Sequence, residues 1–352
     1  MKPRNSLCIL GAGPAALLSQ AFLREKGCNP VVVADSVLGN LKPMRYEGIR
    51  VGMVPIFPFK ESELFQRIAW EPPVAADRVS VTFAPGSEDL PDAISPGSHA
   101  EFIANNFSDS RRRLILAKKH VGTGVFTRGF PELRRKVVAN YPQIKRERTL
   151  VGFAEGVSFY LRYIERGGFT VSVRERVLEV DVANRRVVTN SREIRYERLI
   201  STLPISDLVR VAGIQTGIDF VGEGAQIAVA MVREPLEPNR IIYDCDAQSP
   251  IYRAFVPRGG FVVAQVARGH WEVDPGIVAK RIEQLFGLAA TPLILRRFTI
   301  NNCYPLAVSD YALKDELVHH LESSGITLFG RGAQWEYVDL DELEWGRIDS
   351  LQ

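Results

Sequence analysis

Cysteine is scarce in this sequence of 352 residues, and the four that occur are scattered along the chain. No Cys-x-x-Cys pair is present, which disfavours both a structural zinc site and a disulfide framework. The thiols are those expected of buried side chains in a reducing compartment. The four are Cys8, Cys28, Cys245 and Cys303.

Long apolar runs are absent as well. No run approaches the roughly 20 residues that span a bilayer, and the first residues lead into a strand-like segment without the apolar core of a signal peptide. We therefore expect no membrane span and a cytoplasmic location. The five histidines form no spaced set of ligands, so no metal site is expected. Neither Gly-x-Ser-x-Gly nor His-Glu-x-x-His occurs, which leaves a hydrolase without its usual motifs.

Net charge is small, at +3, but basic residues gather in one segment. Residues 111 to 148 hold twelve Lys or Arg against only Glu132 and Glu147. One interpretation is a solvated helical face, supported by the i,i+4 pair Glu132 and Lys136. The other is a cationic rim that attracts a phosphorylated substrate. The segment lacks the interleaved aromatic residues of a single-strand platform, so no nucleic-acid partner is expected.

The most informative stretch lies between residues 6 and 35. It reads as an apolar strand, Gly-x-Gly-x-x-Ala, a helix, a second strand and an acid, which is the dinucleotide-binding fingerprint. Gly11 permits a tight turn, Gly13 lets the backbone approach a pyrophosphate, and Ala16 allows close helix-strand packing. Asp35 can accept hydrogen bonds from ribose hydroxyls, and the helix start directs its amides and dipole at the phosphates. A glycine-rich turn in an empty α/β domain is the alternative. The expected nucleotide-binding residues are Gly11, Gly13, Pro14, Ala15, Ala16 and Asp35.

Strand and helix patterns continue along the rest of the chain. Residues 79–83 alternate like a strand, and the basic segment 102–145 is mostly helical in pattern. Later strand-like runs and one amphipathic helix are clearer. The predicted strands lie at 169–173, 177–182, 186–189, 199–202, 226–232, 251–256, 260–267 and 326–329, and the predicted helix at 275–286.

Four segments occur in the order seen in flavin amine oxidoreductases. They are the glycine-rich N-terminus with Asp35, Val177 in a meander strand, the run Ile200-Ser201-Thr202-Leu203-Pro204, and the run from Phe329-Gly330-Arg331 to Asp341. The chain resembles that superfamily and, within it, is most similar to UDP-galactopyranose mutase. Pro250-Ile251-Tyr252-Arg253 resembles the segment that bears the diphosphate-binding arginine of the mutases, and Tyr304-Pro305 resembles their Tyr-Pro segment.

The resemblance implies an α/β fold in which a Rossmann-like FAD-binding domain of amine-oxidase type is interleaved with a mixed β-sheet substrate domain and a helical insertion. The implied FAD-binding domain comprises 1–60, 150–215 and 300–352. The implied helical, substrate-capping insertion is 61–149, and the substrate-domain sheet is 216–299. The implied cofactor is FAD, and to the fingerprint residues it adds Val177, Thr202, Gly330, Arg331, Asp339 and Leu340. The implied catalytic residues are Arg253, Tyr304, Tyr337 and Asp339.

The C-terminal motif also makes physical sense by itself. Gly330 ends an apolar strand and Gly332 can take a positive φ, so the backbone after Phe329 can pass close to a ligand. The segment from Asp339 to Leu343 is expected to begin a helix, whose first amides meet a second part of the cofactor. An ordinary connection with acidic N-capping is the alternative. Simpler roles are likewise open for the other candidates: surface for Arg253, and core packing for Tyr304, Trp335 and Tyr337.

The sequence departs from the mutases in two segments, the second of which carries a histidine that lies against the flavin ring in that family. Leu38-Gly39-Asn40 replaces a Gly-Gly pair, and Val54-Pro55-Ile56-Phe57-Pro58-Phe59 lacks the histidine of the corresponding segment. Residues 85 to 150 also lack a clear copy of the second mutase arginine, for which Arg146 and Arg148 are loose candidates. Either the substrate differs from UDP-galactose or the redox chemistry has changed.

Three functions follow as hypotheses. The first is an FAD-dependent mutase-like enzyme acting on a nucleotide-linked sugar, in which N5 of the reduced flavin attacks the anomeric carbon and the sugar recloses with another ring size. The second is an amine-oxidase-type oxidoreductase, which the missing histidine favours. The third is a non-catalytic nucleotide-binding homologue. The partner expected is a small-molecule substrate, and the oligomeric state is open, a homodimer included.

Overall fold

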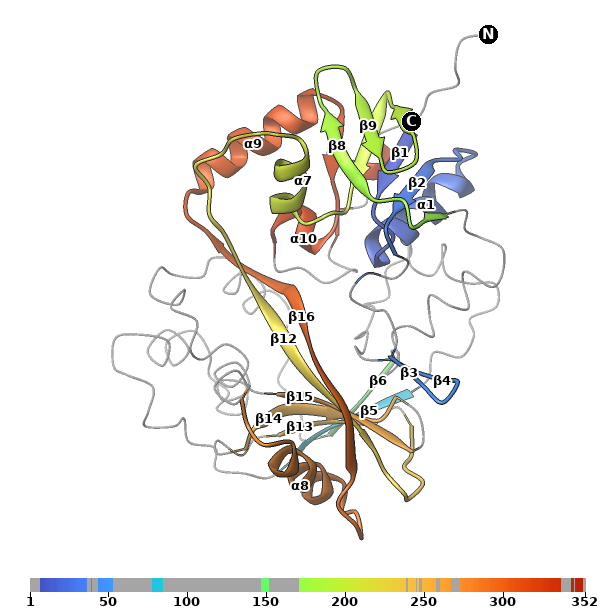
Figure 1. Cartoon of the computed structure of the whole chain (residues 1–352), viewed down its shortest axis with the longest axis vertical. Helices are drawn as coiled ribbons and strands as arrows, with labels where there is room; N and C mark the ends of the chain where they lie inside the picture. The colour runs from blue at the N-terminus through green and yellow to red at the C-terminus, as the bar shows by residue number, and fades with distance from the viewer. Residues whose placement is uncertain are drawn as a thin grey trace.

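The computed structural model describes residues 7–36, 39, 44–52, 78–84, 147–151, 171–238, 240–244, 246, 249–257, 260–266, 272–336, 343–344 and 346–350. These residues form two lobes, which a long pair of antiparallel strands joins (Figure 1). The first lobe contains a five-stranded sheet, and the second lobe contains most of a seven-stranded sheet.

The sheet of the first lobe is wholly parallel. Its strands follow the order β17-β11-β1-β2-β7, so the first two strands of the chain lie beside strands from its middle and its end. Helix α1 connects β1 to β2 and confirms the predicted strand-helix-strand unit. The bounds are β1 (Leu7–Leu10), α1 (Pro14–Glu25), β2 (Val31–Ala34), β7 (Val171–Val173), β11 (Arg198–Ser201) and β17 (Ile326–Leu328).

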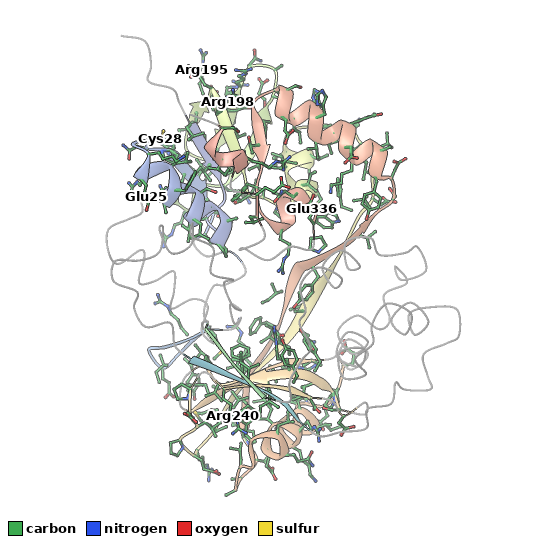
Figure 2. The ribbon with its side chains drawn as sticks, turned by 180° about the vertical axis from the view of Figure 1, so that it is seen from behind. Glu25, Cys28, Arg195, Arg198, Arg240 and Glu336 are labelled. Atoms are coloured by element: carbon green, nitrogen blue, oxygen red, sulfur yellow. The ribbon has the colours of Figure 1, made fainter. Side chains whose placement is uncertain are left out.

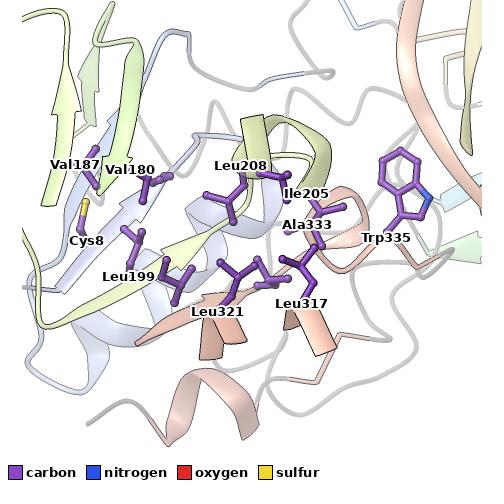
Figure 3. Packing of buried hydrophobic residues seen from close by; sticks show 14 of the residues in the cluster. Cys8, Val180, Val187, Leu199, Ile205, Leu208, Leu317, Leu321, Ala333 and Trp335 are labelled. Carbon is purple, nitrogen blue, oxygen red and sulfur yellow. The ribbon is translucent and has the colours of Figure 1, made fainter. Parts of the chain in front are cut away.

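A three-stranded meander and short helices cover this sheet. Apolar side chains from β1, β11 and β17 pack with those of the meander, α7 and α9 in one continuous cluster, part of which Figure 3 shows. Cys8 lies at one end of that cluster and Trp335 at the other. The elements are β8 (Val177–Asp181), β9 (Arg186–Thr189), β10 (Glu193–Arg195), α7 (Ile205–Val211), α9 (Tyr311–Ser323), α10 (Arg331–Gln334) and α11 (Gly346–Asp349).

The second sheet is mixed and has the order β16-β12-β15-β14-β13-β5-β6. Only the β13 and β5 pair is parallel among its pairings. Helix α8 packs on one face, and the hairpin of β3 and β4 contributes Met44 and Val51 to a cluster with β12 and β15. The elements are β3 (Met44–Tyr46), β4 (Ile49–Val51), β5 (Arg78–Ala84), β6 (Glu147–Val151), β12 (Phe220–Met231), β13 (Arg240–Asp244), β14 (Ile251–Phe255), β15 (Phe261–Val266), α8 (Pro275–Phe286) and β16 (Leu293–Val308).

The long strands β12 and β16 extend from the second sheet to the first lobe (Figure 1). Their register shifts between Val221 and Gly222, between Glu223 and Ala225, and between Val229 and Ala230. Such irregularities bend a strand and increase its local twist. The pair therefore sets how the two lobes are placed relative to each other.

Local sequence signals explain the elements that were predicted well. Helix α8 occupies the predicted residues because the Asp274 side chain accepts a hydrogen bond from the Gly276 amide at 2.8 Å, Pro275 opens the first turn, and Gly287 ends the helix at φ 65°. The predicted strands from residue 169 to 267 and at 326–329 are confirmed with shifted ends.

Other expectations fail. The predicted helix beginning at Asp339 does not continue through Leu343 and Glu344, which are not helical, and the next helix starts at Gly346. Gly332 lies in the α10 turn without a positive φ, because the left-handed residues that reverse the chain there are Gly330 and Trp335.

The proposed domain limits stay a prediction. Within the expected helical insertion 61–149, the described residues are strands, namely β5 and the start of β6, and both belong to the second sheet. The helices expected elsewhere in that range lie outside the described residues. No helix in the described segments combines the length and apolar character needed to cross a bilayer.

A buried ion pair fixes α8 against the second sheet. Asp244, at the end of β13, is fully buried and accepts hydrogen bonds at 2.7 and 2.6 Å from Nε and Nη2 of Arg281. Arg281→Ala leaves that carboxylate buried without this partner, so we expect a loss of about 3 kcal/mol in the free energy of unfolding, measured in urea. As a control, Arg210→Ala breaks the exposed pair with Asp207 and should cost less than about 1 kcal/mol. Equal losses in the two variants would contradict this account.

Candidate functional site

The candidate site begins at the carboxyl ends of β1 and β11, where the chain turns into α1. The Leu10 carbonyl oxygen accepts hydrogen bonds from both the amide and the hydroxyl of Thr202, at 2.9 and 2.8 Å. Gly11 follows with φ +99°, and its amide donates to the Val33 carbonyl at 2.8 Å. A Cβ at position 11 would collide with Oγ1 of Thr202. The structure therefore brings the two predicted residues Gly11 and Thr202 together and explains the glycine.

Gly13 and Pro14 form the N-terminus of α1. Gly13 is its N-cap and makes no side-chain cap bond, and an added Cβ there would meet no atom of the described residues within 4 Å. Pro14 occupies the first helical position, where no amide proton is needed. Ala16 is fully buried against the sheet, as close packing requires. The predicted steric roles of these three residues fit the geometry, and a helix N-terminus of this kind suits a phosphate group.

The C-terminal part of the chain passes directly over this helix. Gly330 takes φ +106°, and a Cβ on it would lie 2.8 Å from Cβ of Ala15. The turn is held by hydrogen bonds from the Phe329 amide to the Ser201 carbonyl at 3.0 Å and from the Gly330 amide to Oε1 of Gln334 at 3.1 Å. Gly330 therefore lies beside the first turn of α1, and the cofactor-binding roles of Gly330 and Arg331 stay predictions.

The segment that leads to Val177 meets the end of β2 at Asp35. Asp35 is exposed at the end of β2, and its carbonyl oxygen accepts a hydrogen bond from the Arg174 amide at 3.2 Å. The Glu175 amide donates to the Ala34 carbonyl at 3.0 Å. The chain leaving β7 thus turns against the end of β2, and Val177 begins β8 two residues later. Both residues therefore belong to the same edge of the site.

Sequence analysis missed an ion-pair cluster that joins the segment before β8 to the end of β9 and the turn after it. The Glu175 carboxylate is 5% exposed and accepts hydrogen bonds from Nε and Nη2 of Arg192, at 2.8 and 3.0 Å, and from the hydroxyls of Thr189 and Ser191, at 2.8 and 2.9 Å. Hydrogen bonding to Arg192 is the main cause that lowers the pKa of Glu175 to about 2. These partners lie 14 to 17 positions from Glu175 and meet through the turns of the meander, so no short motif marks them.

Arg253 lies in the second sheet and is 9% exposed. Its Nε donates to Oε1 of Gln265 at 2.7 Å and its Nη1 to the Tyr243 hydroxyl at 3.3 Å. The guanidinium carbon lies 5.7 Å from the ring centre of Tyr243 and 6.0 Å from that of Tyr252. The predicted surface alternative for Arg253 is therefore wrong.

The guanidinium of Arg253 carries a positive charge. Burial acts to lower its pKa, but coulombic interactions with Tyr243, Tyr252 and Tyr304 outweigh burial, and the net pKa is raised. Tyr304 is buried in β16, opposite Glu223 of β12. Arg253 lies in β14 of the same sheet, where its partner Gln265 of β15 pairs with Ile227 of β12.

Other predicted residues cannot be joined to this geometry. Tyr337, Asp339 and Leu340 lie outside the described residues, as do Val54 to Phe59 and most of the basic segment 111–148. Their roles stay predictions. Glu336 is the last described residue before Tyr337, and it lies at the end of the first lobe nearest the long strand pair (Figure 2). Within the described part of the chain, no group of His, Cys, Asp and Glu side chains is placed to hold a metal ion.

The parallel sheet with its glycine-rich first turn, joined to a second mixed sheet, defines a two-lobed α/β fold of the dinucleotide-binding type. Solved structures share this architecture. Reduced UDP-galactopyranose mutase matches with a TM-score of 0.66 at 16% identity, over 99% of this chain and 93% of that one. A CLA-producing fatty acid isomerase from P. acnes matches with a TM-score of 0.63 at 14% identity, over 100% and 99%. A double mutant of putrescine oxidase matches with a TM-score of 0.61 at 12% identity, over 99% and 98%.

No family model and no curated protein matches this sequence. At identities of 12% to 16%, the structural likeness shows the fold. It confirms the predicted α/β fold of amine-oxidase type, which the mutase and the oxidase share.

The Glu175 cluster predicts a specific pH dependence of stability. Because the folded-state pKa of Glu175 is about 2 and its ordinary value is 4.5, the cluster stabilises the protein above about pH 4.5 and loses this contribution as the pH falls toward 2. Glu175→Gln and Arg192→Gln should therefore flatten the fall in the free energy of unfolding over this range, measured by urea titration at several pH values. Arg195→Gln replaces an exposed arginine of the same meander and should keep the wild-type slope (Figure 2). Wild-type slopes in all three variants would refute the assignment.

Proposed function

We propose that this chain is an FAD-dependent enzyme that acts on a nucleotide-linked sugar and isomerises its ring in the manner of UDP-galactopyranose mutase. The observation that carries the proposal is the buried, oriented guanidinium of Arg253, in a chain whose other lobe has a glycine-rich helix start. The first feature suits a diphosphate, and the second suits a dinucleotide cofactor.

The first lobe fits FAD in its steric details. Gly13 leaves space where a pyrophosphate approaches the helix, Gly330 allows the C-terminal segment to pass within contact of Ala15, and Asp35 is exposed for ribose hydroxyls. Thr202 lies beside the turn that leads into this helix, and we propose that Val177 contributes to the same site. The proposed cofactor-binding set thus includes residues from the beginning, the middle and the end of the chain, as one extended molecule requires.

The second lobe fits an anionic leaving group. Because the pKa of Arg253 is raised, the guanidinium remains positive at working pH. Gln265 and Tyr243 hold its plane in one orientation, which reduces the entropy lost when it binds a phosphate in bidentate fashion. Negative charge that develops on a departing diphosphate is stabilised by such a preoriented cation.

In the proposed reaction, reduced flavin supplies the nucleophilic nitrogen that attacks the sugar. Arg253 holds the diphosphate before and after it leaves, and Tyr304 orients the sugar beside it. The segment that follows Trp335 carries Tyr337 and Asp339, which we propose lie beside the sugar and the cofactor. The chain thus contributes positioning and charge stabilisation.

An oxidoreductase of amine-oxidase type is the second candidate. It is favoured by the absence of a histidine from Val54 to Phe59, where the mutases place one against the flavin, and it agrees with the likeness to putrescine oxidase. Anaerobic mixing separates the candidates. A mutase requires prior reduction with dithionite and yields a ring isomer of UDP-galactose, whereas an oxidase bleaches its flavin when an amine such as putrescine is added. A colourless protein that takes up no FAD would reject both.

Alanine substitutions at Gly11 and Gly13 provide a steric test of cofactor binding. Gly13→Ala places a methyl group in open space within the protein, so the variant should fold with a melting temperature near that of the wild type but bind FAD at least about tenfold more weakly, because the methyl group blocks the pyrophosphate. Gly11→Ala should instead lower the melting temperature, because it collides with Thr202 at a positive φ. Flavin absorbance after dialysis and thermal unfolding measure the two effects. Full FAD retention by Gly13→Ala would contradict the proposed site.

Arg253 should govern affinity for the nucleotide part of the substrate. Arg253→Lys keeps a positive charge but loses the planar fork, so the dissociation constant for UDP should rise about tenfold, and further in Arg253→Ala. Calorimetric titration of the FAD-loaded protein measures it. Arg240→Ala is the matched control. Arg240 belongs to the same sheet but packs on Phe286 of α8, so its loss should leave UDP affinity unchanged (Figure 2). Unchanged binding in both Arg253 variants would remove Arg253 from the site.

A further inference from the structure

Trp335 joins the two parts of the candidate site. It follows α10 in the first lobe and is 2% exposed, and its backbone takes the left-handed conformation with φ 51° and ψ 51°. A bulky residue is seldom found in this region, and such outliers persist only where the surrounding structure holds them. Its ring contacts the start of the long strand β12, where it meets Phe220 edge-on with ring centres 5.5 Å apart.

The contact with β12 depends on a glycine. A Cβ added to Gly222 would lie 2.9 Å from Cη2 and 3.0 Å from Cζ2 of Trp335, and 3.4 Å from the carbonyl oxygen of Tyr304. The indole is rigid and enclosed, so it has little freedom to move away. Gly222 therefore lies between the Trp335 ring and the backbone of Tyr304, at a point where the register of β12 and β16 shifts.

We propose that Trp335, seated on Gly222, is a positioning residue that fixes Tyr304 and the Arg253 site relative to the glycine-rich helix start. The path consists of packed groups: Gly330 contacts Ala15 of α1, Trp335 follows one helical turn later, and its ring abuts Gly222 beside Tyr304. Further along β12, Ile227 pairs with Gln265, which accepts the hydrogen bond from Nε of Arg253. This inference rests on the proposed function for its choice of ligand.

A size exchange tests the contact. Gly222→Ala introduces a methyl group where the ring lies, and Trp335→Phe removes the part of the ring that abuts Gly222. Each change should weaken UDP binding to the FAD-loaded protein by about tenfold, because small displacements of positioning groups are costly. The double variant should recover most of the lost affinity, because the added methyl group occupies space that the smaller ring vacates. Bound FAD per protein should stay constant throughout.

The control is Gly217→Ala, a substitution three residues before Phe220 at a glycine whose added Cβ meets no described atom within 4 Å. It should leave UDP affinity unchanged. A lowered melting temperature without a change in UDP affinity in the single variants would show that the contact is merely structural and would overturn the proposal. A double variant that binds UDP no better than the weaker single variant would also overturn it.

The same variants separate this inference from the proposed function. If wild-type protein binds no UDP, the nucleotide-sugar function fails, and the contact is then judged by backbone hydrogen exchange in residues 220–231 and 293–308. Faster exchange in both single variants that returns toward the wild-type rate in the double variant would support a positioning contact. Equal exchange in all variants would overturn it.

Discussion

The candidate cofactor site depends on the two hydrogen bonds that Thr202 donates to the carbonyl oxygen of Leu10. They tie the ends of two adjacent parallel strands together and place the Thr202 hydroxyl where a side chain of residue 11 would otherwise stand. Only glycine satisfies both the resulting contact and the positive φ of the turn. The direction of α1, and hence of its N-terminus, follows from this junction.

The source of positive potential differs between the two lobes. At the start of α1, the positive field comes from backbone amides and needs no charged side chain. At Arg253, a full charge is buried, which costs desolvation unless polar groups surround it. Gln265 and the hydroxyl of Tyr243 meet that need, while aromatic faces of Tyr243 and Tyr252 add favourable contacts with the cation. A site made this way can hold an anion with little rearrangement.

Sequence patterns predicted what local chemistry determines. The fingerprint located α1 and its flanking strands, and Pro275 and Gly287 marked the ends of α8. Strand β16 escaped prediction because its 16 residues include Arg296, Arg297 and Pro305 and contain register shifts, so no regular alternation is visible. Its path is fixed by pairing with β12, which is a long-range interaction.

The same limit applies to the site. The likeness of single segments to the mutases predicted Arg253 and Tyr304 separately, and only the strand order shows that both belong to the second sheet. No sequence motif predicted the Glu175 cluster, because its members are separated by two turns of the meander. The mistaken positive φ at Gly332 has a related cause: sequence shows two glycines after Phe329, and only the close approach to Ala15 selects Gly330 as the one that reverses the chain.

The position of the long strand pair explains why distant segments must act together. Strand β12 leaves the first lobe just after α7, and β16 returns to it just before α9, so the second sheet is inserted between parts of the first lobe. An insertion of this kind is held by its two crossing strands and by whatever packs against them. Trp335 packs there from the segment that also contacts α1, and Phe220 and Gly222 are shaped to receive it. The geometry between the first and second lobes is therefore determined at this junction, and the hydrophobic cluster that ends at Trp335 makes the junction part of the core of the first lobe (Figure 3).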